Sequence, residues 1–166
     1  MALTVATYLA MLTWTLPGIL AEAGGLIPLE LRLSGYTYFD AVAFLNELSP
    51  AGLALYRGPH AYLLAFFPAL LALSMALPVN GLLHGRLIGF RLIGVLIPMF
   101  AAVNNYTENI LMARMLSLGA ERITPELVEL TSRATVMKAS FFSISAILTA
   151  ALIIARWWDI RRGATE

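Results

Sequence analysis

Residues 87–112 read LIGFRLIGVLIPMFAAVNNYTENILM, an apolar run that ends in a polar cluster. A helix of about 20 residues crosses a hydrocarbon layer of about 30 Å, and this run is long enough to do so. Polar and ionisable side chains at membrane depth are costly, so they usually face the bundle interior and mark a functional site. The stretch therefore predicts a membrane-spanning helix with a candidate site at Asn104, Asn105, Glu108 and Asn109.

The whole chain shares this apolar character. Of its 166 residues, 60% are apolar and 13% are charged, whereas soluble domains carry about 25% charged residues. We therefore expect one all-α integral membrane domain over residues 1–166, surrounded by the lipid bilayer. The formal net charge of +1, without a basic run, gives no indication of a nucleic-acid partner. The lack of cysteine excludes disulfides, thiolate metal sites and thiol catalysis.

Three further apolar runs are long enough to span a bilayer. Together they predict a bundle of four transmembrane helices, over residues 2–20, 60–83, 87–112 and 134–157. The first run ends near Ala21-Glu22-Ala23, which resembles a signal-peptide cleavage site, but it has no positive n-region and four threonines dilute it. We therefore expect a retained span. Thr124-Pro125-Glu126 has the form of a helix start, from which the fourth helix is expected to continue without a break.

The arginines predict how the bundle is oriented. Four spans place both termini on the side that holds the turn between the second and third spans. Arg86 and Arg91 belong to that very short turn, and Arg156-Trp157-Trp158 combines an aromatic belt with a basic flank. We therefore expect both termini in the cytoplasm. Arginine outnumbers lysine ten to one, which is typical of a high-GC bacterial gene, so a bacterial cytoplasmic membrane is expected.

The linker between the first two spans contains a predicted amphipathic helix over residues 37–49. Thr37, followed three residues later by Asp40, has the form of a capping box. An apolar stripe follows at Val42, Leu45 and Leu48. A helix of this kind beside a membrane usually lies in the interface plane. It is expected to cover the outer end of the bundle, either as a passive lid or as a gate or partner-docking surface.

Prolines 17, 68, 78 and 98 lie within the predicted spans. Each removes one backbone hydrogen bond and tends to kink its helix. In lipid this is tolerated only where neighbouring groups satisfy the freed carbonyl. The kinks are expected to shape the bundle; the functional alternative is a crevice beside a kink, first of all at Pro98.

The spacing of charges predicts an ion pair between the third and fourth spans. Glu108 lies six residues before Arg114, and Lys138 lies five residues after Arg133. At about 1.5 Å per residue, both are about 8 Å inside the outer boundary. A Glu108–Lys138 pair is therefore available at one depth.

Three neighbours on the same helix faces are expected to assist this pair: Asn105, Asn109 and Thr135. The resulting polar layer has two interpretations. It is either a structural clamp, because each charge needs a partner in lipid, or a pocket for a lipid headgroup, a quinone-like ring or a proton. A stripe of small residues on the fourth span is expected to allow close helix packing: Ser132, Ala139, Ser143, Ala146 and Ala150.

No residue pattern indicates a cofactor or a metal. His60 and His84 mark opposite ends of the second span, about 36 Å apart along a helix, so they cannot share one haem or metal. No serine has a histidine at motif spacing, and no glycine loop has the form that cradles phosphates. The expectation is a protein with no cofactor and no metal.

Several short motifs resemble those of a family of small four-span bacterial membrane proteins. The matching residues are Gly35-Tyr36, Phe44-Leu45-x-x-Leu48, Gly52 through Tyr56, Asn105-Tyr106-Thr107-Glu108-Asn109 and Thr135-Val136-Met137-Lys138. The resemblance covers most of the chain and implies the four-span fold without implying an activity. Members of that family often carry an aspartate at the position of Asn105, so the asparagine here argues against a proton relay.

Taken together, these patterns favour a non-enzymatic membrane protein. It would be an accessory or scaffold subunit with a membrane-protein partner, or a module that binds an amphiphile such as a lipid or a quinone-like ligand. The first alternative is a membrane enzyme acting on a lipid or isoprenoid-like substrate, with Glu108 as acid/base and Lys138 stabilising negative charge. The second is a small transporter or a proton pathway that uses Glu108.

Overall fold

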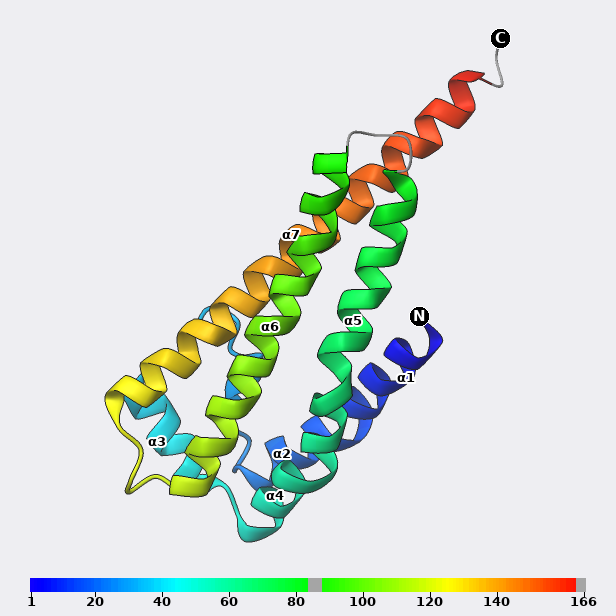
Figure 1. Ribbon diagram of the computed structural model, residues 1–166. Helices are drawn as coiled ribbons and strands as arrows, with labels where there is room; N and C mark the ends of the chain where they lie inside the picture. Colours follow the sequence, from blue (N-terminus) through cyan, green and yellow to red (C-terminus); the bar gives the residue numbers. More distant parts are fainter. Residues whose placement is uncertain (84–87, 164–166) are drawn as a thin grey trace.

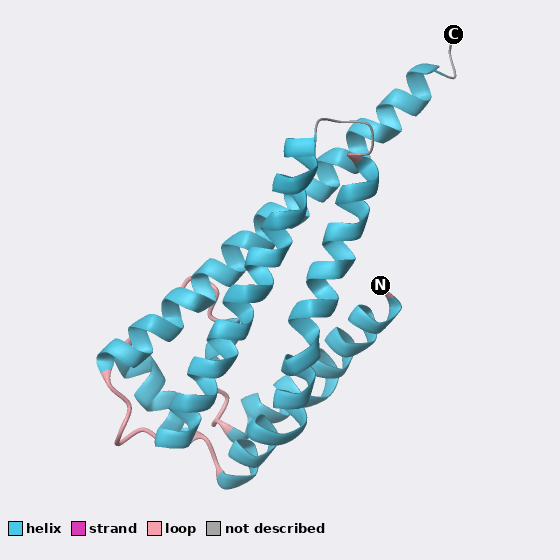
Figure 2. Cartoon of the chain, viewed as in Figure 1, coloured by secondary structure: helices cyan, strands magenta, loops and turns pink. Residues whose placement is uncertain are grey.

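The computed structural model describes residues 1–83 and 88–163, and every regular element in these ranges is helical (Figures 1 and 2). Predictions that concern His84, Arg86 and Leu87, the first residue of the third predicted span, lie outside the described residues. The elements, in chain order, are α1 (Ala2–Ala10), η1 (Met11–Thr15), α2 (Leu16–Glu22), η2 (Leu29–Leu31), α3 (Tyr38–Glu47), α4 (Pro50–Leu55), η3 (Tyr56–His60), α5 (Ala61–Leu82), α6 (Ile88–Leu118) and α7 (Pro125–Gly163).

Four helical segments in the described ranges are long and apolar enough to cross a membrane. They are Ala2–Glu22, Pro50–Leu82, Ile88–Leu118 and Pro125–Trp158. The four long apolar helices that the sequence predicts are therefore present, and they are longer than the apolar runs. The last helix starts at Pro125, as the Thr124-Pro125-Glu126 pattern predicts, because the Thr124 hydroxyl accepts a hydrogen bond from the Leu127 amide at 3.3 Å and caps it. It continues without a break, as expected.

The four long helices are not packed equally. Helix α6 packs along both α5 and α7, whereas α1 makes its main contacts between long helices with α5. Helices α6 and α5 come close together at Gly94, because a Cβ there would lie 2.7 Å from Cγ1 of Val79. The last turns of α7 extend beyond the neighbouring ends of α5 and α6 (Figure 1). This arrangement leaves a groove between α1 and α7.

Helix α3 is the amphipathic helix that the linker predicts. The Thr37 hydroxyl accepts from the Asp40 amide at 3.2 Å, and the Asp40 carboxylate accepts from the Thr37 amide at 2.8 Å, so the capping box is present. The hydrogen bonds that the Thr37 hydroxyl and amide donate to the Asp40 carboxylate hold the pKa of Asp40 below its usual value. The predicted apolar stripe was only partly right: Ala41 and Phe44 are fully buried, whereas Val42, Leu45 and Leu48 pack around them half-buried.

The largest buried apolar cluster lies at one end of the bundle, the end that carries residues 23–60 and 119–124 and is called the loop end below. Its members are Ile19, Ala23, Leu29, Tyr36, Ala41, Phe44, Tyr56, Met112, Met115, Leu116, Ile123 and Val128. Along the spans, most side chains are exposed. A cluster that excludes water is needed only where water is the solvent, so this distribution is compatible with spans that face lipid.

Candidate functional site

Glu108 on α6 and Lys138 on α7 form the ion pair that the charge spacing predicts. The Lys138 ammonium Nζ lies 2.5 Å from Glu108 Oε2, and the Thr135 hydroxyl donates to Glu108 Oε1 at 2.5 Å. The Glu108 side chain is 1% exposed and that of Lys138 is 12% exposed. The Glu108 carboxylate is therefore enclosed by Lys138 and Thr135, whereas the Lys138 side chain stays partly exposed.

A second polar cluster adjoins this pair through Glu30, on η2. Lys138 Nζ donates to the backbone carbonyl of Glu30 at 3.2 Å. The Glu30 carboxylate accepts a hydrogen bond from the Tyr56 hydroxyl, and its other oxygen lies 2.9 Å from Nε2 of His60. The second ring nitrogen of His60, Nδ1, lies 2.8 Å from the Thr15 hydroxyl. Four buried polar side chains from three separate segments thus satisfy one another.

The sequence prediction missed this second cluster. Tyr56 and His60 share one face of the π turn η3, but Glu30 and Thr15 reach them only because the linker folds back over the bundle end. One signal was present in the sequence: Glu30 is a single carboxylate within the apolar stretch Pro28-Leu29-Glu30-Leu31. A carboxylate in such surroundings needs a buried partner.

Tyr36 also lies against the predicted polar layer. Its backbone amide donates to the Ser132 hydroxyl at 2.9 Å, which ties the start of the linker helix to α7. Its phenol group is buried near Thr135 and Glu108, and this burial raises the pKa of Tyr36 well above its usual value. Tyr36 therefore covers the pair from the loop end.

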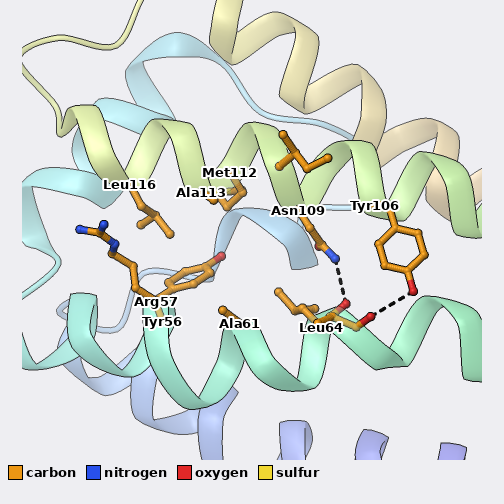
Figure 3. A pocket seen from close by; sticks show the side chains of 11 residues that line it. Tyr56, Arg57, Ala61, Leu64, Tyr106, Asn109, Met112, Ala113 and Leu116 are labelled. Carbon is orange, nitrogen blue, oxygen red and sulfur yellow. Dashed lines mark hydrogen bonds between the residues drawn. The ribbon is translucent and has the colours of Figure 1, made fainter.

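Asn109 does not join the Glu108–Lys138 pair. Pro68 has no N–H, so the carbonyl of Leu64, four residues earlier in α5, lacks its helical donor. The Asn109 side-chain amide donates to that carbonyl at 3.1 Å, and the Tyr106 hydroxyl donates to the next carbonyl, that of Ala65, at 3.0 Å (Figure 3). Asn109 therefore supplies the hydrogen bond that Pro68 removes from the neighbouring helix.

The two other asparagines of the predicted site also make no hydrogen bond to Glu108 or Lys138. Asn104 donates to the carbonyl of Phe100 in its own helix at 2.9 Å and is partly exposed. Asn105 is 4% exposed, and within the described residues its side-chain amide has no hydrogen-bond partner. The structure thus brings Glu108, Thr135 and Lys138 together and leaves Asn105 beside them with unused hydrogen-bonding capacity.

Asn105, Lys138 and Glu30 line the polar end of the groove between α1 and α7. The groove has a volume of about 600 Å³, within the range of about 300–1,000 Å³ that ligand pockets occupy. Its walls come from α1, η1, α5 and α7, and they are mainly apolar: Val5, Tyr8, Leu9, Leu12, Phe67, Leu71, Met75 and Phe142 are among them. Three small residues of the predicted packing stripe, Ala139, Ser143 and Ala146, also line it. These three small side chains border the open space of the groove.

The hydrogen-bonding capacity at the polar end can be counted. A lysine ammonium has three donors, and Lys138 uses two of them on Glu108 and on the Glu30 carbonyl. One donor is left for a ligand, together with the two amide donors and the carbonyl oxygen of Asn105. The positive charge of Lys138 is already balanced by Glu108. The groove end therefore offers hydrogen bonds to an acceptor atom without offering a net positive charge.

No protein family, no curated protein and no solved structure matches this chain. The class that the fold and the site define is a helical protein with four candidate membrane spans in its described residues. It has a buried polar layer at the loop end and an apolar groove that ends on that layer. Its function is inferred from this geometry.

Proposed function

We propose that this chain is an integral membrane protein that binds a long-chain amphiphile in the groove between α1 and α7. The observation that carries the proposal is the groove itself: a volume of about 600 Å³ with apolar walls and a polar end at Asn105, Lys138 and Glu30. An apolar pocket with a few convergent polar groups is the usual form of a small-molecule site. An acyl or isoprenoid chain would lie along the walls, and its head would meet the polar end.

The polar end favours an uncharged head with a hydrogen-bond acceptor, such as a carbonyl, ester or quinone oxygen. The free donors are one N–H of Lys138 and the amide of Asn105. A negatively charged head would face two buried carboxylates, Glu30 and Glu108, while the charge of Lys138 is already paired. An anion would thus be repelled without a compensating free cation.

In this proposal the Glu108–Lys138 pair has a structural role. It holds the ammonium at the groove end and joins α6 to α7, while the Glu30 cluster holds the linker on the bundle. The alternatives in which Glu108 is an acid/base or a proton carrier are less favoured, because Glu108 is 1% exposed and is absent from the described residues that line the groove. A catalytic acid must come within hydrogen-bond reach of its substrate.

The test is to purify the full chain from membranes in a mild detergent and to identify retained amphiphiles by mass spectrometry. Ser143→Phe should abolish enrichment of the groove ligand, because Ser143 is exposed inside the groove and a phenyl ring there would fill it. Ser140→Phe is the matched control: Ser140 is exposed on the same helix but does not line the groove.

A second comparison tests the polar end. Asn105→Leu should lower the affinity for the retained amphiphile roughly two- to tenfold, the equivalent of one net hydrogen bond. Asn104→Leu should leave the affinity unchanged, since Asn104 bonds within its own helix. If no amphiphile is enriched over the bulk lipid, or if both phenylalanine variants retain it equally, the groove is not a ligand site. A scaffold role then becomes the better explanation.

A further inference from the structure

A second pocket opens between α5 and α6 at the loop end (Figure 3), separate from the groove between α1 and α7. Its volume is about 400 Å³, which is also in the range of small-molecule sites. Leu64 contributes to the walls of both cavities and lies between them. The two cavities therefore lie close together but differ in their charged residues.

The pocket exists because of local backbone geometry and small side chains. Gly58 has φ −103° and ψ −105°, so the π turn η3 bends before Pro59 and shifts the start of α5. Three alanines, Ala61, Ala65 and Ala113, line the pocket and are exposed, so no large side chain fills the space between the helices. An apolar slot remains that is open to the surroundings of the bundle.

Arg57 is the charged residue among those that line this pocket. It is exposed, and within the described residues its guanidinium has neither an ion pair nor a hydrogen bond. Two other arginines of the described chain are paired with carboxylates: Arg32 with Asp40 at 3.0 Å and Arg133 with Glu129 at 2.5 Å. A guanidinium offers five donors in a planar fork that suits a phosphate.

We propose that this pocket binds an anionic phospholipid, with the headgroup phosphate on Arg57 and an acyl chain along the alanine-lined slot. The proposal rests on the membrane insertion proposed above, but it needs no ligand in the groove. An unpaired cation beside an apolar slot complements the charge and shape of such a lipid. Basic pockets between helices at the membrane surface bind anionic headgroups in this way. The groove, in contrast, selects an uncharged head.

The test uses the full chain in mixed micelles and counts bound lipids by native mass spectrometry. Phosphatidylglycerol should bind roughly fivefold more tightly than phosphatidylcholine, the effect expected of one basic residue on an anionic lipid, because the choline ammonium of phosphatidylcholine neutralises the phosphate that both lipids carry. Arg57→Gln should remove this preference. Arg114→Gln is the matched control, because Arg114 is also exposed at the loop end of α6 but does not line the pocket. Ala113→Phe should weaken the binding of both lipids by filling the slot.

The proposal is overturned if the wild type shows no preference, or if the two arginine variants lose it equally. Ser143→Phe, which fills the groove, should leave the preference intact. If the preference persists while no amphiphile is enriched in the groove, only the groove proposal fails. If the chain is recovered from cells in the soluble fraction without detergent, membrane insertion fails and both proposals fail with it.

Discussion

At the scale of single residues, the Glu108–Lys138 pair is predicted to be a clamp. Glu108→Gln or Lys138→Met alone should each lower the free energy of unfolding by roughly 3–5 kcal/mol, because each strands a buried charge. The double variant should recover most of the loss, since replacing a buried pair by uncharged groups is often nearly neutral. Thermal unfolding in detergent compares the stability of the wild type, the two single variants and the double variant. Additive losses in the double variant would show that the two charges act independently.

The pair could be predicted from the sequence, whereas the cluster around Glu30 could not. Glu108 and Lys138 lie on consecutive helices joined by a short link, so residue counting alone sets them at one depth. Glu30, His60 and Thr15 come from segments that meet only after the linker has folded. Residue counting also failed for Asn109, because its partner is a carbonyl in α5 that Pro68 leaves without a donor. Pro68 signals that a carbonyl is freed, but not which side chain of a neighbouring helix satisfies it.

At the scale of elements, the hydrogen bond from Asn109 to the carbonyl that Pro68 leaves without a donor gives a second prediction. Asn109→Leu should destabilise the chain by roughly 1–3 kcal/mol, because the Leu64 carbonyl would lose its donor in a water-poor environment. Pro68→Ala supplies an N–H at residue 68 that can bond to Leu64 within α5. In the Pro68→Ala background, Asn109→Leu should therefore cost much less. Equal costs in both backgrounds, measured by thermal unfolding, would show that Asn109 has another role.

The helices start at their capping residues, and these positions agree less well with the boundaries of the apolar runs. Thr37 with Asp40 sets the start of α3, and Thr124 with Pro125 sets the start of α7, nine residues before the apolar run at residue 134. Hydropathy reports which residues lipid could cover, whereas capping reports where backbone donors are first satisfied. The second span begins early for the same reason: the Ser49 hydroxyl accepts from the Gly52 amide at 3.1 Å and starts α4.

At the scale of the whole molecule, the chain divides into two parts with different packing. The loop end has a buried apolar cluster, whereas the remaining helix surfaces expose large apolar side chains such as Phe66, Phe100 and Ile147. This distribution is compatible with helices that face lipid, because lipid exerts no hydrophobic force that would bring those side chains together. The α1–α7 groove and the α5–α6 pocket both adjoin the loop end, where rigid packing holds polar groups in position. Such a division favours ligand sites at the boundary between the two parts.

The orientation of the bundle is the last prediction. Four spans would place residue 121 on the side opposite the C-terminus. From the arginine-rich turn and the Arg156-Trp157-Trp158 flank, we expect the termini in the cytoplasm. Because the chain has no cysteine, a single introduced thiol reports its own location. In intact bacterial cells, a membrane-impermeant maleimide should label Glu121→Cys, and it should label Ala164→Cys only after permeabilisation. The reverse pattern would invert the orientation, and labelling of both from outside would show that α7 does not cross the membrane.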